Sequence, residues 1–318
     1  MPIPPSAPIP AAAPRRGLLA ALPTLLALAL LGFAARWFAA RWQAVMGDGP
    51  PPPIAWGWLA VGFVLLALNA VLALAIWRQV LAAVGAPVRW RQALDTQAPS
   101  LLARYLPGKV WANAVRVALA RRAGVAVGSG AGAVVWETLV MLGAAGLVAL
   151  AGLGWHGEAN ATRAAAGLVA GIAAAWMLTA LVSRHPRGAA LLARVGGTGP
   201  VRSPAALAPS VLLGIAGLLT FGAAHLAIAR AVAPVGLADY PLVAGAVALA
   251  WAGGFLAIVM PLGLGVRDGI LLVLLAPVLS PAQGLLFVAL SRLVQLGLDA
   301  VVTGGWMVGQ VRWRRPAA

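Results

Sequence analysis

Two short stretches combine proline, glycine and cationic side chains inside an otherwise apolar sequence. They are RYLPGKVWANAVR, from Arg104 to Arg116, and VMPLGLGVRDG, from Val259 to Gly269. A Pro-Gly break interrupts a helix, and the helix that restarts after it points its free backbone N–H groups and positive dipole end at the gap. With Arg or Lys beside it, such a helix start suits an anion such as a lipid phosphate. We therefore predict an anion-binding site built at these breaks.

A second interpretation treats each stretch as an ordinary proline kink whose arginines extend to lipid headgroups. The two prolines Pro107 and Pro261 stand about half a chain length apart. Interrupted apolar segments at corresponding places in two halves are typical of transporters built from repeats, with the binding site at the broken helices. We therefore favour the site, and predict that residues 97–122 and 261–280 form broken or re-entrant helices that approach each other in a pseudo-repeat.

The substrate-binding candidates lie in these breaks or within the apolar segment between them. They are Arg104, Pro107, Gly108, Lys109, Arg116, Glu137, Pro261, Gly263, Gly265, Arg267 and Asp268. A charge near the bilayer centre costs on the order of 2.5–3.5 kcal/mol on insertion scales. We therefore expect Glu137 inside the bundle beside an arginine, with Arg116, Arg267 and Arg292 as candidates and the first two favoured.

A polar stripe is predicted in the last apolar segment, because Arg292, Gln295 and Asp299 follow at i, i+3 and i+7. It is either a structural Arg292–Asp299 network or a further substrate contact. His225 and Asn69 stand alone in apolar runs and are expected to form interhelical hydrogen bonds rather than to bind a ligand.

The elements that must position these residues are transmembrane helices. The chain of 318 residues is 62% hydrophobic and only 9% charged, with a mean hydropathy of +0.93, far outside the range of soluble domains. Its formal charge of +16 comes from arginines between apolar runs, so we expect contact with anionic lipids and no nucleic-acid partner. The sequence contains no cysteine, which excludes disulfides and thiolate metal sites.

The apolar runs predict an all-α, polytopic bundle of about eight spans. Residues 1–14 are predicted to be a disordered Pro/Ala-rich tail, residues 15–312 a single transmembrane domain and residues 313–318 a cytoplasmic tail. A signal peptide is the alternative for the first run, which is longer than a usual signal-peptide core. The predicted spans are Gly17–Ala35, Ile54–Trp77, Val125–Leu153, Ala164–Ser183, Pro209–Val232, Pro241–Met260, Arg267–Leu279 and Pro281–Met307.

The arginines also predict the orientation of the chain. Most of them fall in the tail, between Arg78 and Arg122, from Arg184 to Arg202, and at the C-terminus. The positive-inside rule then places both termini in the cytoplasm, in a cytoplasmic (inner) membrane.

The sequence resembles a known family, the flippase-like membrane domain called the lysylphosphatidylglycerol synthase transmembrane region. The resemblance spans about residues 15–312 and rests on RYLPGKVWANAVRVALARRAGV, on VVWETLVML around Glu137 and on PLGLGVRDGILLVLL. The family's usual PGGxGxRE appears here with one glycine fewer and with Asp268 in place of Glu. What the family implies is movement of anionic or modified lipids between leaflets. In two-part members a cytosolic aminoacyl transferase follows, whereas this sequence ends at Ala318, and we expect a stand-alone membrane unit.

Three classes of function remain open from the sequence. The favoured one is a lipid translocator, not an enzyme, with anionic membrane lipids as partners and neither a metal nor a cofactor. An intramembrane lipid-modifying enzyme would usually show clustered carboxylates or a histidine–acid pair, and the seven acidic residues are scattered. The third is a non-transporting scaffold for an envelope-lipid synthesis enzyme, which is also a candidate partner of a translocator. The oligomeric state and the identity of the lipid are left open.

Overall fold

The computed structural model describes residues 53–104, 110–184, 204–257 and 265–313, together with Arg36, Ala39 and Ala40. Every regular element within these residues is a helix, which confirms the all-α class. The predicted span Gly17–Ala35 and the tail 1–14 lie outside the described residues. The count of eight spans therefore stays a prediction.

Four described helices are long and apolar enough to cross a membrane. They are α2 (Trp56–Ala83), α5 (Val127–Trp155), α8 (Ala208–Arg230) and α11 (Pro281–Trp313), and each overlaps most of a predicted span. Two more apolar segments form α6 (Ala159–Arg184) and the 17-residue α9 (Tyr240–Leu256), while the 3-10 turn η1 (Pro204–Leu207) leads into α8. At 1.5 Å per residue, α9 is about 26 Å long, close to the thickness of the hydrocarbon core.

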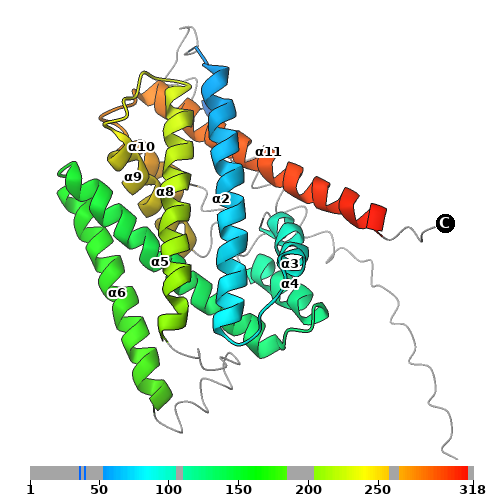
Figure 1. The fold of residues 1–318 in the computed structure, drawn as a ribbon. Coiled ribbons are helices and arrows are strands. Elements are labelled where there is room, and N and C mark those ends of the chain that lie inside the picture. The colour runs from blue at the N-terminus through cyan, green and yellow to red at the C-terminus, as the bar shows by residue number, and fades with distance from the viewer. Residues whose placement is uncertain are drawn as a thin grey trace, which may run out of the picture.

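The helices form a bundle in which α2 and α8 lie side by side and α5 crosses them obliquely (Figure 1). Helix α9 packs against α5, α8 and α10, and α6 covers the outer side of α5 (Figure 1). The main core is apolar and is built from α5, α8, α9 and α11, with Phe221, Phe287 and Leu153 among its fully packed side chains. This core forms because side chains from several helices exclude lipid from the space between them.

Helices α5 and α9 meet backbone to backbone at two glycines. A Cβ added to Gly152 would lie 2.2 Å from the carbonyl oxygen of Pro241 and 3.0 Å from the Cα of Gly245. A Cβ added to Gly245 would lie 2.9 Å from the backbone nitrogen of Leu153. Without side chains at this crossing the two backbones approach closely, and van der Waals packing replaces the hydrophobic force that is missing between helices in lipid.

The first Pro/Gly stretch does break a helix. Helix α3 (Trp90–Ala103) ends just before it and α4 (Val110–Arg122) begins just after it, and the two helices pack against each other. With 14 and 13 residues they are each about 20 Å long, too short to cross about 30 Å of hydrocarbon alone. Pro107, Gly108 and Lys109 lie in the gap, outside the described residues.

The second Pro/Gly stretch separates α9 from α10 (Val266–Leu274), and a further break separates α10 from α11, which begins at Pro281. The N-cap of α10 is Gly265, whose φ of 83° lies in the left-handed region that glycine adopts without strain. Its backbone N–H donates to Oδ2 of Asp268 at 3.3 Å, so the carboxylate caps the helix start. Pro261 and Gly263 lie outside the described residues.

We expect Gly152→Ala to destabilise the bundle, because the new methyl group would overlap the carbonyl oxygen of Pro241 and push α5 from α9. Overpacking of this kind costs about 1–3 kcal/mol. The matched control is Gly171→Ala on α6, where an added Cβ meets nothing within 4 Å. That control should unfold at the wild-type temperature or slightly above it, since alanine is the better helix former. Thermal unfolding in detergent, followed by tryptophan fluorescence, measures both, and equal melting temperatures would contradict the close crossing.

Candidate functional site

Two ion pairs join the broken segments to α11. Arg292 on α11 donates to Oδ1 of Asp268 on α10 through Nη2 at 2.8 Å and Nε at 3.2 Å. Seven residues further along α11, Asp299 pairs with Arg104, the residue that follows α3. Asp268 and Asp299 are both buried. Arg292 and Asp299 thus each tie α11 to another segment, Arg292 to α10 and Asp299 to the residue that follows α3.

Arg267 lies on the same turn of α10 as Asp268 but is held differently. Its Nη2 lies 3.0 Å from Nε2 of His225 on α8, and its guanidinium carbon lies 5.7 Å from the centroid of the Phe221 ring. The other ring nitrogen of His225, Nδ1, lies 2.8 Å from the carbonyl oxygen of Phe221. A carbonyl only accepts, so Nδ1 carries the proton and Nε2 accepts from Arg267. This contact between α8 and α10 confirms the interhelical role predicted for His225.

The result is a cluster with an excess of positive charge, which we call the arginine cluster. It comprises Arg104, Arg267, Arg292, Asp268 and Asp299. The charges of Arg292 and Arg104 both act on Arg267, and Asp268 offsets them in part. Three guanidinium groups thus face two carboxylates, and none of the carboxylates among the described residues lies within ion-pair distance of Arg267.

Helix α3 is fastened to α11 beyond this cluster by further polar contacts. The hydroxyl of Thr303 donates to the carbonyl oxygen of Ala98 at 3.2 Å. Nε1 of Trp306 and Nε2 of Gln310 both donate to Oδ1 of Asp95 at 2.8 Å. These α11 residues continue the face of Asp299, since they follow it at i+4, i+7 and i+11. The predicted polar stripe is confirmed as one helical face, and it is longer than predicted.

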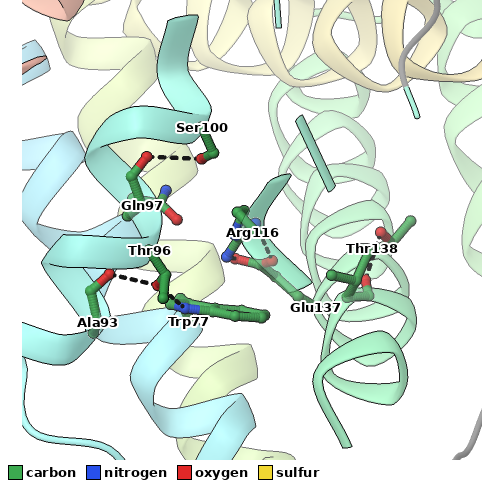
Figure 2. A network of polar contacts seen from close by, with 9 residues as sticks. Trp77, Ala93, Thr96, Gln97, Ser100, Arg116, Glu137 and Thr138 are labelled. Carbon is green, nitrogen blue, oxygen red and sulfur yellow. Dashed lines mark hydrogen bonds and ion pairs between the residues drawn. The ribbon is translucent and has the colours of Figure 1, made fainter. Parts of the chain in front are cut away.

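A second, separate charge pair lies under the α3–α4 hairpin (Figure 2). Arg116 on α4 is 8% exposed, and it makes a two-point contact with Glu137 on α5, at 2.7 Å from Nη1 to Oε2 and 3.0 Å from Nη2 to Oε1. The guanidinium carbon of Arg116 also lies 3.8 Å from the centroid of the Trp77 ring. Nε1 of Trp77 in turn donates to Oγ1 of Thr96 on α3 at 2.9 Å. One arginine thus links α2, α4 and α5, and Trp77 adds α3.

The structure confirms that Glu137 pairs with Arg116, one of the two favoured arginines. It does not bring Arg116 to Arg267, because they share no partner among the described residues. The side chains around Arg116 belong to a smaller apolar cluster with Trp77, Ala120 and Val125, whereas Arg267 contacts Phe221 of the main core. Helix α3 packs on α11, and α10 packs on α11 too, so the two breaks meet by way of α11.

The comparison with known families agrees with this arrangement. The model of the family described as the lysylphosphatidylglycerol synthase TM region matches residues 16–302, nearly the whole chain. The chain belongs to this family. It is therefore a multi-pass membrane protein connected with lipid handling. No match is found among curated proteins.

Several residues of this transmembrane region were not among the predicted site residues. His225 was expected to be structural, yet it contacts Arg267, which has no described carboxylate within ion-pair distance. Nothing in the sequence indicated that Trp77, at the end of an apolar run, would contact Arg116 and Thr96. Trp306 and Gln310 could have been found by extending the face of Asp299 along the helix.

We expect Arg116→Gln and Glu137→Gln each to destabilise the protein strongly, because either change leaves the other charge buried without its partner. Breaking a buried pair in this way costs about 3–5 kcal/mol. The double variant should lose less than the sum of the two single losses, with a coupling energy of about 0.5–3 kcal/mol. A double-mutant cycle on unfolding in detergent measures this coupling. Strictly additive losses would mean that the two side chains do not act as a pair.

Proposed function

We propose that the protein is a lipid translocator, moving an anionic or phosphate-bearing lipid between the leaflets of the cytoplasmic membrane. The observation that carries the proposal is the arginine cluster, with three guanidinium groups against two carboxylates at the meeting point of two broken helices. Guanidinium groups bind phosphate with paired, charge-assisted hydrogen bonds. Family membership supports lipid handling, and the cluster supports a phosphate headgroup.

In this proposal Arg267 makes the first contact with the headgroup. A guanidinium group has five N–H donors, and His225 occupies one of them with a neutral acceptor. The remaining donors are available to phosphate oxygens. Because Asp268 is engaged by Arg292 and by the backbone of Gly265, it compensates Arg267 only in part.

The two ion pairs keep the other arginines compensated when no lipid is bound. An unpaired buried charge is costly, so Arg104 forms an ion pair with Asp299. Arg292 forms one with Asp268 for the same reason. A phosphate entering the cluster offers Arg104 a second anionic partner. Its pairing with Asp299 is the more accessible of the two, since the Arg104 side chain is 32% exposed and that of Arg292 is 22% exposed.

The short helices fit re-entrant segments in this proposal. Neither α3 nor α4 is long enough to cross alone, and a pair of packed short helices enters and leaves the membrane from one side. Backbone groups freed at the breaks are tolerated in lipid only where protein, water or a ligand supplies partners. The polar face of α11 from Arg292 to Gln310 borders this region and gives the headgroup a polar path.

Arg116 and Glu137 are assigned a supporting role. Their charges satisfy each other, and Trp77 covers the guanidinium face, so the pair holds the hairpin against α2 and α5.

The arginines near the end of α2 and the start of α5 support the predicted orientation. Ala83, Val84, Ala120, Val125 and Leu207 form one buried cluster, so the end of α2, the α4–α5 junction and the start of α8 lie together. Five arginines surround this end, namely Arg78, Arg89, Arg91, Arg121 and Arg122, as expected for the cytoplasmic side.

The test measures leaflet exchange of labelled phosphatidylglycerol in proteoliposomes that contain equal amounts of folded protein. We expect Arg267→Gln to slow exchange about 10–100-fold, the equivalent of one charge-assisted hydrogen-bonding group worth about 1.5–3 kcal/mol. Arg267→Lys should restore exchange in part, since lysine keeps the charge and loses the two-point contact. The control Arg163→Gln removes an exposed arginine whose contact is with Asn160 on α6, and it should exchange lipid at the wild-type rate.

Wild-type exchange by a well-folded Arg267→Gln variant would contradict the phosphate site. Lipid analysis of the same vesicles separates the other classes of function. A new lipid product would indicate a lipid-modifying enzyme. Neither exchange nor product from wild-type protein would indicate a scaffold.

A further inference from the structure

A groove lies between α4 and α5. Its volume is about 780 Å³, within the range of about 300–1,000 Å³ that is usual for small-ligand sites. Val117 on α4 and Val127, Ala131 and Val134 on α5 form its apolar lining, and Arg121 and Arg122 line it near the α4–α5 junction. The groove thus combines an apolar surface with a cationic end.

The two arginines are not neutralised within the described part of the chain. Arg121 and Arg122 occupy the last turn of α4 and are exposed, and none of the described carboxylates lies within ion-pair distance of either. Helix α5 begins five residues after Arg122 and has no acidic residue in its first turn. The cationic end therefore attracts an anion.

The position of the groove relates its two ends to the bilayer. The α4–α5 junction belongs to the arginine-rich end of the bundle, where Val125 packs with the end of α2. From there the apolar lining on α5 extends from Val127 to Val134, about 10 Å along the helix axis toward the membrane interior. Phosphate at the interface and hydrocarbon directed inward is the order of groups in a glycerophospholipid.

We propose that this groove binds one anionic phospholipid, with its phosphate on Arg121 and Arg122 and an acyl chain along Val117, Ala131 and Val134. Charge complementarity selects this occupant, because an apolar helix would satisfy the lining and leave both arginines without an anion. The site is distinct from the arginine cluster, since its described lining residues lie on α4 and α5 and include no member of that cluster. A lipid there packs against both α4 and α5, in addition to the Arg116–Glu137 pair that joins them, and so stabilises the hairpin that carries the first break.

The test titrates the purified full chain in neutral detergent with dioleoylphosphatidylglycerol or dioleoylphosphatidylcholine and follows thermal unfolding. The 13 tryptophans provide the signal, and a ligand that binds the folded state raises the melting temperature by mass action. We expect phosphatidylglycerol to raise the melting temperature saturably and phosphatidylcholine to raise it far less. One basic residue near an anionic lipid surface strengthens binding about five- to sixfold. Removing two of them in Arg121→Gln/Arg122→Gln should therefore weaken the apparent affinity about 30-fold.

A charge-matched control separates this site from general attraction of anionic lipid to the basic end. Arg89→Gln/Arg91→Gln removes two exposed arginines beside Trp90, where α3 begins, at the same arginine-rich end of the bundle. This variant should keep the apparent affinity within about threefold of wild type. Ala118→Phe tests the acyl-chain part, because Ala118 lines the groove and is exposed, so the larger ring fills the groove without entering the core. That variant should also lose most of the phosphatidylglycerol effect.

Three outcomes would overturn the proposal. Equal losses for the two arginine pairs would mean surface charge alone. An unchanged response in Ala118→Phe would mean that no acyl chain lies in the groove. No response of the wild-type protein to phosphatidylglycerol would mean that another segment of the chain, such as residues 1–52, or a second copy occupies the groove.

Discussion

The interruption of helices inside an apolar bundle is the constraint on which the rest of this structure depends. A continuous helix satisfies its own backbone, whereas each break leaves N–H and C=O groups that lipid does not solvate. At the start of α10 the carboxylate of Asp268 accepts a hydrogen bond from the N-cap N–H of Gly265. That carboxylate then requires a cation in turn, and Arg292 on α11 supplies it. The breaks therefore bring buried charges with them, and α11 supplies the residues that pair with those charges.

Helix α11 has this role because it is both the longest described helix and polar along one face. Its partners come from α10 at Arg292 and from α3 at Asp299, Thr303 and Trp306. A wholly apolar helix would hold these segments only by shape. Hydrogen bonds between helices in membranes are modest individually, about 0.6 kcal/mol on average, but a row of them fixes register.

The arginine cluster and the Arg116–Glu137 pair differ in their balance of charge. Arg116 and Glu137 balance each other in charge, and an aromatic ring covers the guanidinium face. The arginine cluster has one guanidinium group more than it has carboxylates, and His225 holds the extra one as a neutral acceptor. An excess charge in a bundle interior is costly, and a ligand of opposite sign would offset it.

Composition and hydropathy determined the class, since an apolar sequence with runs of span length has no soluble alternative. Proline and glycine determined both breaks, because their effect on the backbone is local: α3 ends before Pro107 and α9 ends before Pro261. The helical period likewise placed Arg292, Gln295 and Asp299 on one face. Pairing across helices was decided only by the tertiary structure. Arg292 binds Asp268 on α10 because an ion pair forms with whichever charge packing brings within reach. Sequence spacing carries that information along one helix but not between helices.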